Sequence, residues 1–148
     1  MRNRYNAMDI KQYIPTEVEN LIEGGTLLKG LLQDCKEKYT DSAICNIQYS
    51  KGNCTFELVE NKHINCGFYD TIAPCASFLI ECVGVTQIKQ EGTGELDYGY
   101  YADINFSTKK LPDKTLISFS YVHEWTQTNL FFVEAEKMRL VKYEKQNF

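Results

Sequence analysis

The stretch from Thr115 to Tyr143 constrains the fold most strongly, because it holds two β-type runs around a polar turn. Side chains of a strand alternate between two faces, so every second residue of each run shares a face. We place the turn at residues 126–129 and expect the central hairpin of a half-buried antiparallel sheet. One face of the first run carries Ile117, Phe119, Tyr121, His123 and Trp125, and one face of the second carries Phe131, Val133 and Ala135.

Composition is that of an ordinary folded protein rather than a disordered chain. Of the 148 residues, 43% are hydrophobic and 24% are charged, which predicts a single domain spanning residues 1–148. An aromatic content of 13% favours β structure. The formal net charge of -4 disfavours nucleic acid and anionic membranes as partners and permits a basic protein partner.

Two helices are predicted in residues 15–39, after an arm at residues 1–14. Thr16 and Glu19 have the spacing of a capping box, and Gly24-Gly25 supplies a stop for the first helix. The second helix is expected to begin at Thr26. Its apolar stripe, which predicts one packed face, consists of Leu28, Leu31, Leu32 and Cys35.

Short strands separated by turns are predicted from residue 42 to residue 145. Ser50 to Asn53 has the composition of a hairpin turn, and Gly84 indicates a bulge in the strand around it. Strands that follow one another in sequence usually pair, so we expect a meander. The fold class is therefore α+β, with one or two N-terminal helices packed on an antiparallel sheet of six to eight strands.

Six cysteines raise the question of compartment and of metal binding. No apolar run follows Arg2 and Arg4, so no signal peptide is expected, and reduced thiols in a cytoplasmic protein are the default. In a secreted protein the six could instead form three bridges. His63 and Cys66 have an H-x-x-C spacing, but the chain contains no C-x-x-C pair. We therefore expect no metal site and no cofactor.

Catalysis by a nucleophile would need a histidine beside a cysteine or serine, and the chain has only two histidines. His63 lies in a polar stretch that indicates a surface position. His123 lies on the aromatic face beside Trp125, where a hydrogen-bonded core or interface histidine is the simpler interpretation. A small-ligand or enzymatic pocket near His123 and Trp125 is the alternative hypothesis, and a deep apolar cavity there would favour it.

The segment from Glu91 to Ser107 departs most from a plain scaffold, since it combines acids with tyrosines and contains no lysine or arginine. Tyrosine is enriched at interface centres, and surrounding acids steer a basic partner. A glycine-rich loop whose tyrosines cover the edge of the core is the structural alternative. The candidate partner-binding residues are Glu91, Glu95, Asp97, Tyr98, Tyr100, Tyr101 and Asp103.

The order of predicted helices and strands resembles that of a known protein family. A short helical start followed by strands containing Phe68-Tyr69-Asp70, CASFLIECVGVTQIKQ and NLFFVEAEKMRLVKYE looks like the small immunity proteins of bacterial polymorphic-toxin and contact-dependent growth inhibition systems. The likeness is one of size, acidity and β-rich pattern over most of the chain, without a matching motif. It implies a cytoplasmic, non-enzymatic protein that binds a cognate toxin domain and blocks it. A structural subunit that forms homo-oligomers is a third hypothesis.

Overall fold

A computed structural model of the chain describes residues 13–66, 69–91, 102–123 and 126–146. It contains two short helices and a seven-stranded sheet, which confirms the predicted α+β class and the predicted number of strands. The elements in chain order are α1 (Thr16–Glu19), β1 (Ile22–Glu23), α2 (Gly25–Glu37), β2 (Asp41–Ser50), β3 (Asn53–Cys66), β4 (Tyr69–Gln90), β5 (Ala102–Lys110), β6 (Thr115–His123) and β7 (Asn129–Lys145).

The strand order is β2-β3-β4-β7-β6-β5, so the prediction of one continuous meander is wrong. The sheet is built from two three-stranded meanders that join along β4 and β7, its two longest strands. The chain leaves the edge of β4 open when it crosses to β5, and β7 later fills that edge in antiparallel register. This pairing connects residues distant in sequence, which a rule about neighbouring strands does not detect.

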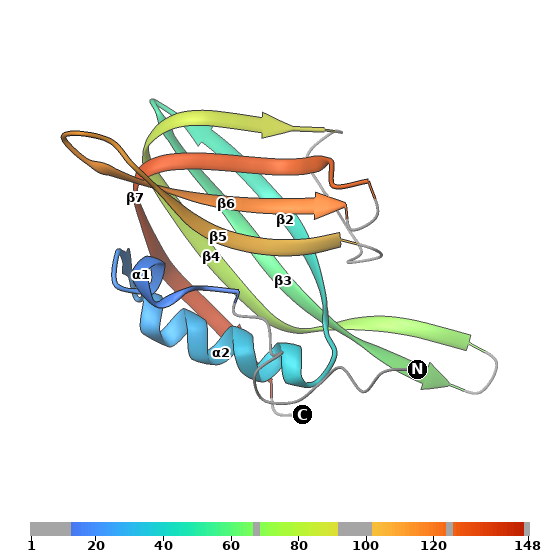
Figure 1. The fold of residues 1–148 in the computed structure, drawn as a ribbon. Helices are drawn as coiled ribbons and strands as arrows, with labels where there is room; N and C mark the ends of the chain where they lie inside the picture. The colour runs from blue at the N-terminus through green and yellow to red at the C-terminus, as the bar shows by residue number, and fades with distance from the viewer. Residues whose placement is uncertain (1–12, 67–68, 92–101, 124–125, 147–148) are drawn as a thin grey trace.

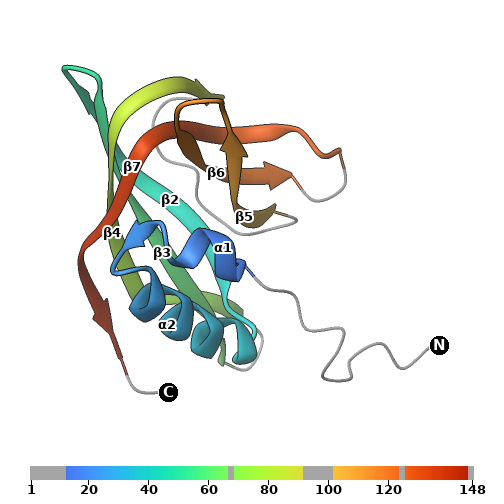
Figure 2. The same ribbon diagram turned by 60° about the vertical axis from the view of Figure 1, so that its left-hand side comes forward.

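The sheet curls until strands that are not neighbours meet across its concave side (Figures 1 and 2). Phe56 of β3 and Phe119 of β6 have ring centroids 4.8 Å apart, although β4 and β7 separate their strands. The curvature comes with irregularities in the ladder between β4 and β7, at Leu79/Ile80 and at Val85/Gln87. Gly84, beside the second irregularity, has φ +69°, in agreement with the predicted bulge.

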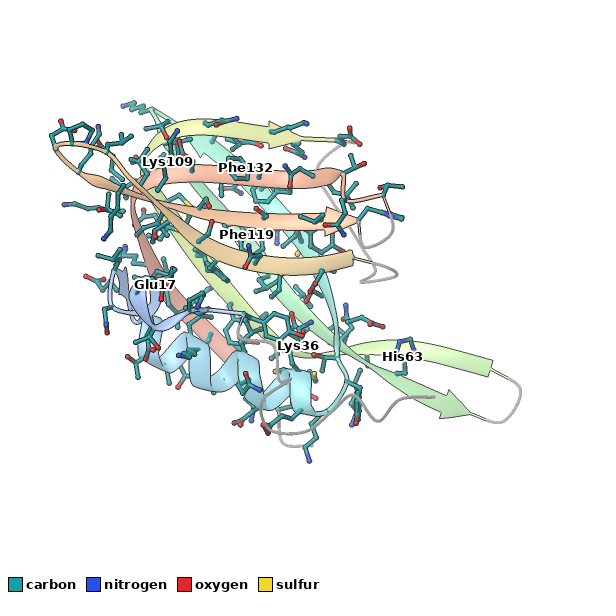
Figure 3. All side chains as sticks on the ribbon, viewed as in Figure 1. Glu17, Lys36, His63, Lys109, Phe119 and Phe132 are labelled. Carbon is teal, nitrogen blue, oxygen red and sulfur yellow. The ribbon has the colours of Figure 1, made fainter. Side chains whose placement is uncertain are left out.

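The predicted hairpin is present as β6 and β7, with their registers set by pairs such as Phe119 with Val133 and Tyr121 with Phe131. The two strands place Phe119, Tyr121 and Phe131 on the concave side, where all three are buried. In Figure 3 Phe119 points into the curl of the sheet. The alternation seen in the sequence therefore identified the apolar residues of the buried face. His123 of that face is only half-buried, and Ser118 and Glu134 of the opposite face are buried as well.

The capping box predicted at Thr16 and Glu19 is not formed, because α1 is a single turn whose N-cap is Pro15. The Glu19 carboxylate accepts a hydrogen bond from Lys29 of α2 at 3.0 Å instead of capping its own helix. Gly24 and Gly25 begin α2 rather than end the first helix, and Gly24 adopts φ +78° as the N-cap. Between the helices, β1 adds a short parallel pairing to β7.

The predicted apolar stripe of the second helix is confirmed. Leu28, Leu32 and Cys35 are buried, and Leu31 packs partly against the same core. The helices lie at the open side of the curled sheet in Figure 2. Within the predicted arm at residues 1–14, residues 1–12 lie outside the described part. Ile14 is buried, and the carbonyl of Tyr13 accepts a hydrogen bond from the Phe106 amide on edge strand β5 at 3.2 Å.

Candidate functional site

The acidic, tyrosine-rich segment is only partly within the described residues. Glu91 is exposed, and its amide donates to the Leu130 carbonyl at 2.9 Å, so the end of β4 is tied to β7. Asp103 is half-buried at the start of β5, where its Oδ1 accepts from the Ile104 amide at 3.0 Å. The other predicted contact residues, which lie outside the described part of the chain, are Glu95, Asp97, Tyr98, Tyr100 and Tyr101.

The two described ends of this segment lie at one rim of the curled sheet. Register pairs Asp103 with Val122 at the end of β6, and Gln90 with Phe131 near the start of β7. These strand ends gather on the right of Figure 1. A shallow depression of about 330 Å³ opens there, lined by Asp103, Ile104, Asn105, Val122 and Gln127. The rim therefore offers polar and apolar surface beside Asp103.

His123 belongs to the same rim but faces a turn rather than a deep cavity. Its amide donates to the Thr128 carbonyl at 2.9 Å, and its ring Nδ1 accepts from the Thr126 amide at 3.3 Å. Trp125, its predicted neighbour, lies outside the described residues. His123 therefore helps to close the turn between β6 and β7, which matches the interpretation of a hydrogen-bonded histidine.

Aromatic rings fill the interior beneath this rim. Phe119 contacts Phe56 and Phe106 with centroids 4.8 and 4.9 Å apart, and Phe131 lies 5.2 Å from Phe56. All four rings have a relative exposure of 0%. Among the described residues, this packing leaves the interior occupied by side chains. It counts against the alternative of a deep ligand pocket under His123.

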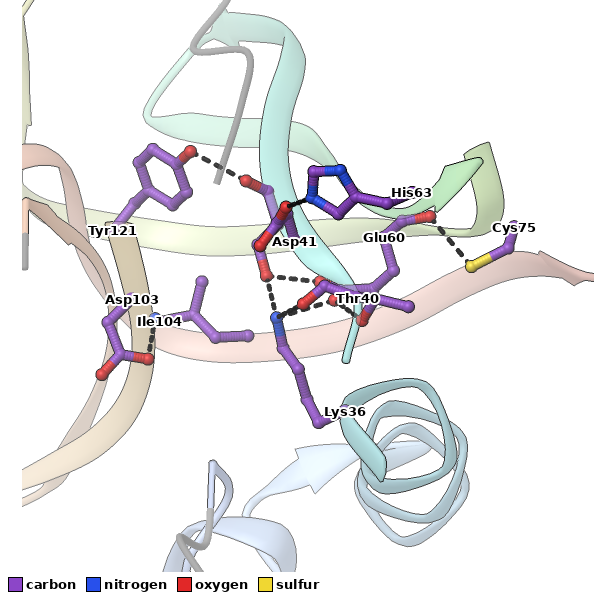
Figure 4. Close-up of polar contacts among 10 residues, drawn as sticks. Lys36, Thr40, Asp41, Glu60, His63, Cys75, Asp103, Ile104 and Tyr121 are labelled. Atoms are coloured by element: carbon purple, nitrogen blue, oxygen red, sulfur yellow. Dashed lines mark hydrogen bonds and ion pairs between the residues drawn. The ribbon is translucent and has the colours of Figure 1, made fainter. Parts of the chain in front are cut away.

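A buried polar cluster that was not predicted from the sequence lies across the concave side of the sheet from Tyr121, around Glu60 of β3 (Figure 4). Glu60 is fully buried. Thr40 Oγ1 donates to its Oε1 and Ser42 Oγ donates to its Oε2, each at 2.6 Å. A signal was present in the sequence, since Glu60 continues the inward alternation of Cys54, Phe56 and Leu58.

Lys36 of α2 supplies the positive charge of this cluster. Its Nζ lies 2.8 Å from Glu60 Oε1 and donates to Ser42 Oγ at 2.6 Å, and it sits 5.6 Å from the centre of the Tyr13 ring. Every partner needed by the Glu60 carboxylate is thus supplied by α2 and by the chain from Thr40 into β2. Such complete satisfaction is typical of a structural ion pair that fixes a helix on a sheet. We therefore interpret the cluster as part of the scaffold.

His63 is on the surface, as predicted, and its Nε2 forms an ion pair or hydrogen bond with Asp41 at the start of β2. It lies near the base of a two-stranded ribbon of β3 and β4 that continues past the last pairings with β2 and β7. Figure 1 shows this ribbon projecting from the sheet. The described residues contain no cluster of three or more potential metal ligands, and none of their helices is long and apolar enough to cross a membrane.

Cys35, Cys45, Cys54, Cys75 and Cys82 are free thiols, and all of these except Cys45 are buried. Burial raises the pKa of the Cys35 thiol to about 12 and that of Cys54 to about 11, and it raises the pKa of Cys82 as well. The thiols are thus held neutral, in the manner of small hydrophobic groups. None of these three has the depressed pKa that marks a reactive cysteine.

Comparison of the chain with protein-family models, with curated proteins and with solved structures found no match.

Proposed function

We propose that this chain is a non-enzymatic binding protein, most concretely an immunity protein that neutralises a cognate toxin domain by tight protein-protein contact. The proposed contact surface is the acidic, tyrosine-rich segment with its two roots, Glu91 and Asp103. The proposed partner is a basic domain such as a nuclease-type toxin, because acids around tyrosines favour a basic partner. The chain is proposed to act in the cytoplasm, without a cofactor.

The observation that carries this proposal is that both described ends of the segment, Glu91 and Asp103, are attached to paired strands of the sheet. Glu91 is tied through its amide to Leu130 of β7, and Asp103 is paired in register with Val122 of β6. Glu91 directly follows β4 and Asp103 lies on β5, so both ends of the segment are held by paired strands, which reduces the ordering cost that binding would otherwise carry. The shallow depression beside Asp103 provides a further place for a partner side chain.

The small-ligand or enzymatic alternative is less well supported. The rings of Phe56, Phe106, Phe119 and Phe131 occupy the interior, and the depression at the rim is shallow and adjoins a turn. His123 contacts Thr126 and Thr128 within that turn. Activity of the purified chain on a small substrate, lost in the variant His123→Ala and retained in His63→Ala, would replace the binding proposal with this one.

The test of the binding proposal uses the toxin domain encoded next to the gene of this chain. The two are co-expressed, and cell growth and co-purification are measured. We expect the wild-type chain to protect growth and to co-purify with the toxin. The double variant Asp97→Ala/Tyr100→Ala should lose about 100-fold or more in affinity, because two central contacts would be removed.

The matched control is Asp113→Ala/Tyr39→Ala, which removes the same residue types at exposed positions outside the segment. It should bind like the wild type. Unchanged binding by Asp97→Ala/Tyr100→Ala would remove the segment from the proposal. Failure of the wild-type chain to protect growth or to bind would remove the immunity function itself.

A further inference from the structure

The four buried cysteines of the described chain are arranged as two facing pairs. Cys54 of β3 is directly opposite Cys82 of β4 in the antiparallel register, on the inward face between the strands' other buried side chains. The second pair joins two different layers, because Cys35 is on α2 and Cys75 is on β4. The Cys35 and Cys75 thiols interact with each other and with Glu60, whose carbonyl accepts from Cys75 Sγ at 3.3 Å.

The geometry of the first pair meets the requirement of a disulfide. Directly opposed residues in an antiparallel ladder have Cα atoms about 4.5–5.5 Å apart, and disulfides span about 4.4–6.8 Å between Cα atoms. The two thiols share a face, as Cys54 and Cys82 are 1% and 0% exposed. No backbone movement is therefore needed to bring the Cα atoms within range.

In the second pair, both cysteines are fixed by contacts of neighbouring residues. Cys75 Sγ donates to the Glu60 carbonyl at 3.3 Å (Figure 4). The Cys75 carbonyl accepts from the Gln146 amide at 2.8 Å. Cys35 belongs to the buried stripe of α2. The next residue, Lys36, forms the ion pair with Glu60 that fixes this end of the helix. The packing of α2 on the sheet thus holds the two thiols in the same neighbourhood, around Glu60.

Cys45 differs from these four. It is half-buried on β2, and the residue opposite it in the register is Glu57 rather than a cysteine. The fold therefore separates two mutually facing pairs from a cysteine whose register partner is a carboxylate. Six cysteines allow about fifteen complete pairings, and the fold favours two specific links among them.

We infer that Cys35–Cys75 and Cys54–Cys82 are two disulfide modification sites, which form when the chain folds in the presence of a small-molecule disulfide oxidant such as oxidised glutathione. One cysteine thiolate attacks the oxidant and forms a mixed disulfide, releasing one thiol. The second cysteine thiolate attacks that mixed disulfide and releases the second thiol. Two electrons pass from the protein to the oxidant for each bond, and the two cysteine protons end on the released thiols.

Burial determines when this exchange occurs. Thiolates are the attacking species, and the native fold keeps these four side chains out of solvent and largely protonated. Exchange is therefore slow with the folded, reduced protein and proceeds during folding, while the thiols are accessible. Each bond closes a long loop, of about 40 residues for Cys35–Cys75, and so restricts the unfolded chain.

The test refolds the denatured, reduced wild-type chain in a buffer of oxidised and reduced glutathione, and in parallel with reduced glutathione alone. Intact mass and peptide mapping without reduction then identify the linked cysteines. We expect a loss of about 2 Da for each bond and peptides joined as Cys35–Cys75 and Cys54–Cys82. The oxidised product should melt about 5–10 °C above the reduced one.

The variants Cys35→Ala/Cys75→Ala and Cys54→Ala/Cys82→Ala serve as mutual controls, since each should retain the bond of the other pair. Cys45→Ala should retain both. A dominant product with other linkages, or a native chain that stays fully reduced in the oxidising buffer, would overturn the inference. The wild-type mapping decides this even where a variant folds poorly. It is also independent of toxin binding, so the two proposals can fail separately.

Discussion

Tyr121 of β6 donates its buried hydroxyl to the carbonyl of Ser42 on β2 at 2.8 Å, which joins two strands that lie far apart in the order of the sheet. Three strands separate the two positions along the hydrogen-bonded ladder. The bond therefore spans the concave side of the sheet and helps to hold its curl. It also connects the aromatic interior with the buried polar cluster, because Ser42 Oγ donates to Glu60.

We predict that Tyr121→Phe lowers the free energy of unfolding by about 1–2 kcal/mol, because a buried carbonyl loses a donor while the ring packing is kept. Urea unfolding followed by circular dichroism measures the shift in midpoint. Tyr39→Phe is the matched control, since Tyr39 is 86% exposed and its change should have no effect. Equal midpoints for Tyr121→Phe and the wild type would show that the bond across the sheet contributes nothing to stability.

A second prediction concerns the ion pair between Lys36 and Glu60. Lys36→Met leaves the fully buried Glu60 carboxylate without its cation, and Glu60→Gln leaves the half-buried Lys36 ammonium without its anion. Each should cost about 2–4 kcal/mol. The double variant should cost less than the sum of the two, because removing both charges avoids the unpaired state. Lys114→Met, which breaks an exposed pair with Glu136, should have no measurable effect. Additive losses in the double variant would contradict the coupling.

The parts of the fold that could be predicted from the sequence are those determined by local patterns. Phe119 and Tyr121 alternate with less buried residues, and Leu28, Leu32 and Cys35 recur at helical spacing, so each pattern identifies its own buried face. The pairing of β4 with β7 depends on which edge remains open after the chain has crossed to β5. That information is spread over the whole chain, and no local pattern contains it.

The buried polar cluster around Glu60 shows the same division between local pattern and tertiary contact. Glu60 alternates in sequence with the buried residues of β3, so the pattern predicts that it faces inward. The role of a carboxylate at such a position becomes clear only when its hydrogen-bond donors are known. Those donors come from Thr40, Ser42 and Lys36, which the packing of α2 against β2 brings together. The capping box failed for a similar reason, because Glu19 gains a charged partner in Lys29 of the neighbouring helix. Tertiary contacts thus override local propensity at these positions.

A third prediction compares two glycines of α2. A Cβ at Gly25 would lie 2.2 Å from the Glu19 carbonyl oxygen, whereas a Cβ at Gly30 would meet nothing within 4 Å. Gly25→Ala should therefore destabilise the protein by about 2–3 kcal/mol, since backbone must move. Gly30→Ala should stabilise it by about 1 kcal/mol, because Gly30 lies in an exposed helix interior. Thermal melting measures both, and changes of the same sign in the two variants would contradict the close approach of α1 to the start of α2.

A fourth prediction concerns alkaline pH. The folded pKa of Cys35 is raised to about 12 and that of Cys54 to about 11, above the value of 9.0 for an unperturbed thiol. Above about pH 9 the unfolded chain loses these protons while the folded chain keeps them. Stability is therefore complete below about pH 9 and falls as the pH rises toward about 11–12, by at most about 1.4 kcal/mol per pH unit for each thiol.

The measurement is urea unfolding of the reduced protein at several pH values between about 8 and 10.5. Tyrosines and lysines also titrate in this range, so the comparison is between the wild type and the variant Cys35→Ala. That variant should be less stable at about pH 8, because its cavity costs packing energy, and its stability should fall less steeply above about pH 9. Cys45→Ala, at a half-buried position, should keep the wild-type slope. Identical slopes for the wild type and Cys35→Ala would mean that the Cys35 thiol ionises as readily in the fold as in the unfolded chain.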